Sequence, residues 1–170
     1  RSVSSGGPAV LASTVPTSSN TVAEELVDYL NKSWTSFHAT AESARMLSEA
    51  GFVRLSERDE WDLQKGGRYF FTRNMSSIVA FAVGEKYTPG NGFNISGAHT
   101  DSPCPKLKPV SAVTKGGFLQ VGVQTYGGGL WHTWFDRDLS VAGRVLLRRG
   151  RNDGRTSHEL VRVARPILRI

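Results

Sequence analysis

The stretch ISGAHTDSPCPKLKP, Ile95 to Pro109, decides how the chain is divided. An apolar, strand-like run ends in His99, and Asp101 follows two residues later, just before Pro103 breaks regular structure. The carboxyl ends of strands in an α/β sheet are where such sheets bind ligands. The stretch therefore predicts the end of a sheet strand with an imidazole and a carboxylate at its edge.

Helical signals precede this strand. Thr21 and Glu24 form a capping box that opens a first helix, whose apolar residues continue at helical spacing to Trp34. A second helix is expected to begin with Thr40 as its cap and to stop at Gly51. His38 lies in the predicted link between these helices, where a surface or capping role is expected.

Strand signals replace the helical period after Gly51. The runs GGRYFFTRN, 66–74, and SSIVAFAVG, 76–84, are separated by a turn-like segment and predict a hairpin. The run FNISGAH, 93–99, predicts a third strand, apolar enough to lie in a sheet covered on both faces. Helices followed by buried strands indicate an α/β fold class.

Beyond Pro103 the pattern becomes that of an all-β module. Alternating runs predict strands over Phe118 to Tyr126 and Leu139 to Leu147, and ELVRVARPILRI, 159–170, adds another. The boundary falls near residues 103–108, which predicts an α/β part over 21–104 and a β-rich part over 105–170. Residues 1–20 are rich in Ser, Gly and Pro and contain no acidic residue, as in a disordered head.

Composition narrows the function classes. The net charge of +6 comes largely from carboxy-terminal arginines that alternate with apolar residues, a pattern typical of the solvated face of a sheet, so we expect no nucleic-acid partner. No apolar run reaches the roughly 20 residues of a membrane span, so no membrane partner is expected. Cys104 is the single cysteine, which excludes an internal disulfide framework. We expect its side chain to fill space in an apolar environment. The lack of disulfides favours a reducing, cytoplasmic location. An organellar location, plastid or mitochondrion, is the alternative if the Ser-rich head is the remnant of a transit peptide.

The spacing of His99 and Asp101 has two interpretations. The imidazole can give a nitrogen lone pair to a divalent metal while the carboxylate orients a ligand or a catalytic water. The other interpretation is a histidine that only forms hydrogen bonds at a strand end. The two residues alone do not separate these alternatives.

Longer phrases carry a resemblance to a known family. GAHTDSPCPKLKP, 97–109, YGGGLWHTWFDRDLSVAGRV, 126–145, and RPILRI, 165–170, resemble the amino-terminal part of the aspartyl aminopeptidases, the M18 family of zinc metallopeptidases. The resemblance extends from about Thr21 to Ile170.

The resemblance implies a two-zinc exopeptidase that removes Asp or Glu from peptide amino termini by metal-activated water. It implies an α/β catalytic domain interrupted by a β-rich dimerisation domain, and self-association from dimers to a dodecamer. His99 matches the family's first zinc ligand, and Asp101 matches the catalytic carboxylate beside it.

The remaining ligands implied by the resemblance lie in the carboxy-terminal half of the family, which this sequence does not contain. Because each zinc takes about four ligands, we expect this chain alone to be inactive and a further segment, in the same protein or on a second chain, to complete the site. The alternative is a non-catalytic assembly module that keeps the β-rich interface.

Other polar residues receive structural interpretations. His132, between two tryptophans, is expected to be a packed or surface residue, and His158 a residue at a loop edge. Asp136, Arg137 and Asp138 are expected to form a structural ion-pair network. Gly127 to Gly129 indicates tight backbone packing, since no phosphate-binding helix follows.

Overall fold

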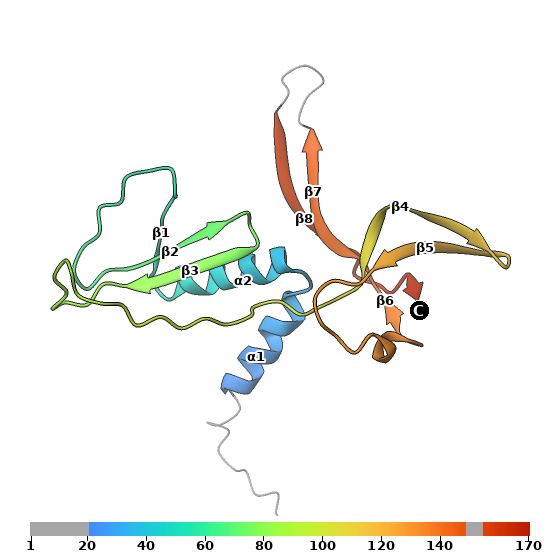
Figure 1. Cartoon of the computed structure of the whole chain (residues 1–170), viewed down its shortest axis with the longest axis horizontal. Helices are drawn as coiled ribbons and strands as arrows, with labels where there is room; N and C mark the ends of the chain where they lie inside the picture. The colour runs from blue at the N-terminus through green and yellow to red at the C-terminus, as the bar shows by residue number, and fades with distance from the viewer. Residues whose placement is uncertain (1–20, 149–154) are drawn as a thin grey trace, which may run out of the picture.

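The computed structural model describes residues 21–148 and 155–170, so the predicted disordered head lies outside the described residues. The amino-terminal part holds two helices and a three-stranded sheet (Figure 1). Their bounds are α1 Thr21–Lys32, α2 Ser36–Glu49, β1 Val53–Arg54, β2 Arg68–Arg73 and β3 Ser77–Ala82. None of the described helices is long and apolar enough to cross a membrane.

The sheet has the order β1-β2-β3, with β1 parallel and β3 antiparallel to β2, which confirms the predicted hairpin. Side chains on β2 alternate between its two faces. Phe70 is fully buried, and Ala39 of α2 is fully buried as well. On β2, Tyr69 and Phe71 instead make ring contacts with Phe81 and Trp61, respectively. Helix α2 therefore covers one face of the sheet and an aromatic cluster lies on the other.

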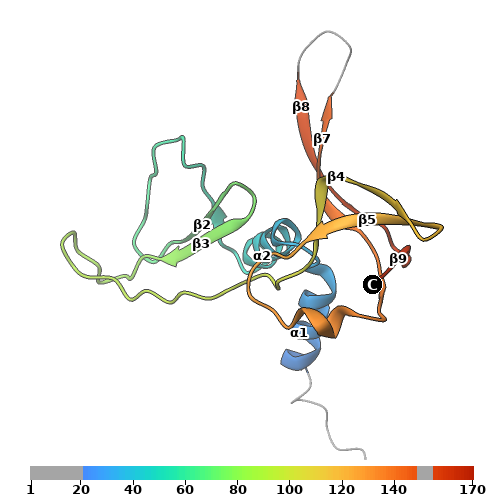
Figure 2. The same cartoon turned by 45° about the vertical axis from the view of Figure 1, so that its right-hand side comes forward.

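The second part of the chain consists of short two-stranded sheets, in agreement with the predicted β-rich character. Figure 2 shows the hairpins β4–β5 and β7–β8 projecting in different directions from a common base near α2. The bounds are β4 Lys106–Lys115, β5 Phe118–Gln124, β6 Asp138–Leu139, β7 Ala142–Arg148, β8 Thr156–Arg162 and β9 Leu168–Arg169. A short 3₁₀ helix, η1 Trp131–Trp134, interrupts them, and His158 lies inside β8 rather than at a loop edge.

Strand β4 was not predicted. Its pairing with β5 shifts register between Leu107 and Ala112, a segment that contains Pro109. Proline has no backbone N–H to give to the ladder, so a register shift is the usual way for a strand to contain one. That irregularity weakens the period-2 signal in the sequence.

The predicted third strand over 93–99 is wrong. The segment is without regular structure, and the side chains of Phe93 and Ile95 are 81% and 88% exposed. A buried strand needs a hydrogen-bonded neighbour and side chains packed on its faces. Among the described residues no strand pairs with this segment, so its apolar residues have nothing to pack against.

The predicted start of the second helix is also wrong. Thr35 is the N-cap, and its hydroxyl accepts a hydrogen bond from the His38 backbone N–H. Thr40 lies inside α2 and is buried, while Gly51, with φ of 82°, ends the helix as expected. Because α2 begins earlier, His38 is a buried helical residue and not a surface residue in a link.

The β7–β8 hairpin contacts the start of α2 through two arginines. The guanidinium of Arg144 lies 4.3 Å from the ring centre of Phe37, and that of Arg162 lies 3.9 Å from the ring centre of Trp34. Arg144 also donates a hydrogen bond to the backbone carbonyl of Asn74 at 3.2 Å. These two arginines are therefore not part of a purely solvated face: they stack on aromatic rings and join the two parts of the chain.

Truncation of the buried Phe70 tests the packing of α2 on the sheet. Phe70→Ala should lower the free energy of unfolding by about 3 to 5 kcal/mol, because it removes a fully buried ring. Phe93→Ala, at an exposed phenylalanine, should change it by no more than about 0.5 kcal/mol. Urea unfolding followed by circular dichroism measures both, and equal effects would contradict this packing.

The buried His38 should make stability depend on pH. Burial, and secondarily the charge of Arg162, lowers the pKa of His38 below its usual 6.5. His38 therefore binds a proton more readily in the unfolded chain than in the folded chain. The contribution of the neutral His38 side chain to the free energy of unfolding is complete above pH 6.5 and is lost as pH falls below it. His38→Gln should make the free energy of unfolding depend less on pH between about pH 7 and pH 5, where carboxylates titrate little.

The matched control for that experiment is His158→Gln, at an exposed histidine of β8. In this variant, stability should change with pH as steeply as in the unchanged protein. An unaltered slope in His38→Gln, measured by thermal unfolding across the same pH range, would contradict the assignment.

Candidate metal centre

His99 lies in the irregular segment between β3 and β4, and this segment is tied to the helices. The Tyr29 hydroxyl of α1 donates a hydrogen bond to the Thr100 carbonyl at 3.3 Å, and the Ser43 hydroxyl oxygen of α2 lies 3.2 Å from the Tyr29 hydroxyl oxygen. The backbone next to His99 is therefore held by the helix pair rather than by a sheet ladder.

Asp101 holds the imidazole of His99 on one side. The Nδ1 atom lies 2.7 Å from the Asp101 backbone carbonyl oxygen and 3.0 Å from its carboxylate oxygen Oδ1. Both oxygens are acceptors, so the hydrogen-bond network assigns the proton to Nδ1 and leaves a lone pair on Nε2. The prediction that His99 and Asp101 act as a pair is consistent with this contact.

The two side chains differ in exposure. The His99 side chain is 73% exposed, whereas that of Asp101 is 12% exposed. A histidine ligand normally gives one ring nitrogen to the metal and donates the other N–H to a carboxylate or carbonyl, which sets its tautomer and orientation. His99 and Asp101 therefore fit one zinc ligand and its orienting partner.

The described residues do not complete a coordination sphere. Within 21–148 and 155–170, no three His, Cys, Asp or Glu side chains are grouped so that they could hold a metal ion. A zinc site needs about four ligands, of which at least three usually come from protein. Among the described residues, His99 and Asp101 are thus too few to hold a metal ion by themselves.

The other residues noted in the sequence lie away from this pair or play structural parts. Burial raises the pKa of the half-buried Cys104 thiol, which keeps it protonated and suits an apolar filler. His132 is exposed in η1. The expected network at 136–138 forms only in part: Asp138 lies 3.9 Å from Arg169, while Arg137 donates to the Thr133 carbonyl.

Close packing at Gly127 connects the loop after Asp101 to the β-rich part. A Cβ atom at Gly127, where φ is 77°, would lie 3.3 Å from Pro103 Cγ. Nearby, the Lys106 ammonium lies 3.5 Å from the ring centre of Tyr126. The expectation of tight backbone packing in the glycine run is thus met at Gly127, and these contacts fix the exit of the His99 segment.

Tyr29 is the positioning residue that sequence reasoning missed. Its hydroxyl donates a hydrogen bond to the Thr100 carbonyl, 71 positions away in the sequence. A hydrogen bond to a backbone carbonyl leaves no pattern in a single sequence, so no signal could have identified it.

Comparison with known proteins identifies relatives of this chain. A profile of the family described as aminopeptidase I zinc metalloprotease (M18) matches residues 29–170. A "Probable aspartyl aminopeptidase" of Ricinus communis is 61% identical over 147 residues, which is 86% of this chain and 30% of that protein.

Solved structures agree with this relationship. A chain in the cryo-EM structure of the Ape4 and Nbr1 complex is 50% identical with a TM-score of 0.82, over 87% of this chain and 28% of that chain. The Saccharomyces cerevisiae mApe1 dodecamer is 33% identical with a TM-score of 0.77, over 89% of this chain and 35% of that chain. The match shows that the described fold is the corresponding part of an M18 peptidase fold.

This chain spans about 30% of the length of the curated relatives it matches. The profile match covers most of the chain and includes both His99 and Asp101. The chain therefore belongs to the M18 family of zinc metalloproteases.

Proposed function

We propose that this chain is the amino-terminal portion of a zinc-dependent aminopeptidase that removes Asp or Glu from the amino termini of peptides. The observation that carries the proposal is the His99 imidazole, whose Nδ1–H is held by Asp101 while Nε2 stays accessible. The names of the relatives, aspartyl aminopeptidases of several organisms, support the acidic specificity.

His99 and Asp101 have distinct roles in this proposal. His99 would hold a zinc ion through Nε2, and Asp101 keeps the ring in the tautomer and orientation that this requires. The chemistry that zinc supplies in such sites is polarisation of the scissile carbonyl and activation of water. Tyr29 limits movement of the segment through the Thr100 carbonyl, so that the imidazole stays in place.

The remaining parts of the centre are proposed to come from polypeptide beyond the described residues. A second zinc ion, the other ligands and the general base would be supplied there, in the same protein or by a second chain. One histidine cannot satisfy a four-coordinate ion, so the 170-residue chain alone is expected to be inactive.

The β-rich part is proposed to act as an inserted dimerisation domain within a larger self-assembly. The β4–β5 hairpin exposes several large apolar side chains, among them Val110 at 89%, Phe118 at 71% and Leu119 at 92%. Clusters of this kind are typical of protein interfaces, and a related structure is titled a dodecamer. The same observation supports the second candidate, a non-catalytic assembly module, and zinc content together with peptidase activity of the complete protein distinguishes the two.

Replacement of the proposed ligand tests the function. In the complete protein, His99→Ala should abolish hydrolysis of a peptide with an amino-terminal aspartate and lower the zinc content, without a change in circular dichroism. Asp101→Asn should lower activity or zinc affinity by about 10- to 100-fold, since it removes the carboxylate that orients the ligand.

His132→Ala, at an exposed histidine in η1, is the control and should retain activity. Near-normal turnover in His99→Ala would refute the assignment of the ligand. Turnover by the isolated 170-residue chain would refute the view that further ligands are needed.

A further inference from the structure

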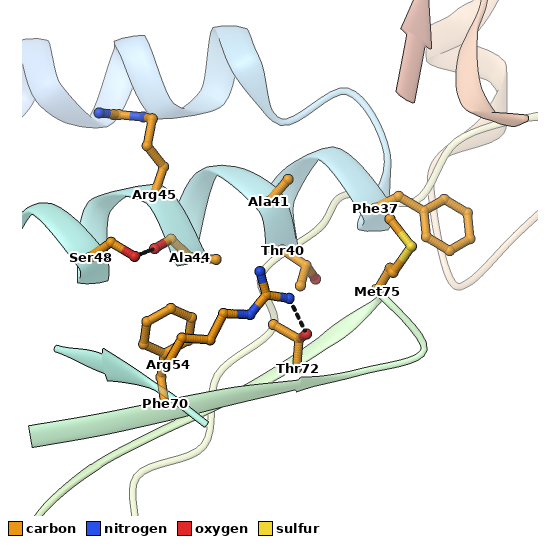
Figure 3. A pocket seen from close by; sticks show the side chains of 10 residues that line it. All are labelled: Phe37, Thr40, Ala41, Ala44, Arg45, Ser48, Arg54, Phe70, Thr72 and Met75. Carbon is orange, nitrogen blue, oxygen red and sulfur yellow. Dashed lines mark hydrogen bonds between the residues drawn. The ribbon is translucent and has the colours of Figure 1, made fainter. Parts of the chain in front are cut away.

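A cavity of about 320 Å³ lies between α2 and the sheet, apart from the His99 segment. Its walls include apolar side chains from α2, from β2 and from the turn that follows β2 (Figure 3). Phe37 and Met75 lie toward one end, and Phe70 forms part of the floor. This volume is at the lower end of the range for small-molecule pockets.

Arg54 brings a positive charge into this cavity. Its guanidinium donates a hydrogen bond to the Thr72 hydroxyl at 3.2 Å, and no described carboxylate forms an ion pair with it. The other arginine of the lining, Arg45, is paired with Glu42 and Glu49 and projects to the opposite side of α2 in Figure 3. The free donors of the Arg54 guanidinium therefore remain for an anion.

Thr40 supplies a second, independent polar group. Its residue is 2% exposed, and its hydroxyl has no hydrogen-bond partner among the described residues. Figure 3 shows its side chain projecting from α2 toward β2, in the space where the Arg54 guanidinium lies. Buried hydroxyls are almost always paired, and one left unpaired is a cost to the fold that a bound acceptor would remove.

We propose that this cavity binds an organic carboxylate with a short apolar body. The carboxylate would accept hydrogen bonds from Arg54 and Thr40, and the apolar body would contact Phe37, Phe70 and Met75. A guanidinium favours carboxylates because its parallel donors match their two oxygens. The proposal does not depend on the peptidase function, since none of the residues involved contacts His99 or Asp101.

Hexanoate is a suitable probe, because it combines a carboxylate with an apolar chain that the cavity can hold. Titration into the 170-residue chain, followed by ¹⁵N–¹H spectra, should give saturable shifts at residues around the cavity. Hexanamide, which has the same shape without the charge, should bind at least about 10-fold more weakly, as expected when a charge-assisted hydrogen bond is lost.

Two arginine variants form a matched pair. Arg54→Gln should weaken hexanoate binding by at least about 10-fold. Arg58→Gln, at an exposed arginine in the loop that follows β1, should leave it unchanged. Equal affinity in Arg54→Gln and the unchanged chain, or equal binding of hexanoate and hexanamide, would overturn the proposal.

Thr40→Val separates ligand binding from folding. Without ligand, this near-isosteric change should raise the melting temperature, because it removes an unpaired buried hydroxyl. The same variant should bind hexanoate several-fold more weakly. A lowered melting temperature with unchanged affinity would show that the hydroxyl serves the fold and would overturn its assignment as a ligand-binding group.

Discussion

The packing of α2 on β2 is the contact on which the rest of the described structure depends. Phe70 and Ala39 are fully buried at this contact, and few other side chains in the described ranges are excluded from solvent to the same degree. Hydrophobic burial is the main favourable term in folding, so a core this small concentrates stability in one helix and one strand. Both the His99 segment and the β7–β8 hairpin are attached to the helices next to this contact.

Polar and aromatic contacts attach the His99 segment and the β7–β8 hairpin to the helix pair. Tyr29 reaches the Thr100 carbonyl, and Arg144 and Arg162 stack on rings at the start of α2. Such contacts are directional and orient the segments they join, but each contributes only modestly to stability. The orientation of His99 therefore depends on an intact helix pair, although the imidazole itself is in solvent.

Two polar groups illustrate how a fold can retain features that do not serve stability. The Thr40 hydroxyl is buried without a partner, and the His99 ring is exposed with its free nitrogen directed away from Asp101. A residue selected for packing alone would not bury an unpaired hydroxyl as Thr40 does. A histidine that only formed hydrogen bonds at a strand end would not need a free ring nitrogen in solvent, as His99 has. Binding sites are where such departures from optimal packing are expected.

Local pattern predicts that two helices and the β2–β3 hairpin exist and that Gly51 ends α2, because each of these features depends on neighbours within a few residues. It misplaces the start of α2, which is capped by Thr35 and not by Thr40. The contact of His99 with Asp101 is likewise local, since two positions separate these residues. Strand formation at 93–99 was not predictable in the same way: an apolar run becomes a buried strand only when partners cover it. The burial of His38, the arginine stacking and the link from Tyr29 to Thr100 join positions far apart in sequence. Only the tertiary structure decides these, since it determines which distant groups meet.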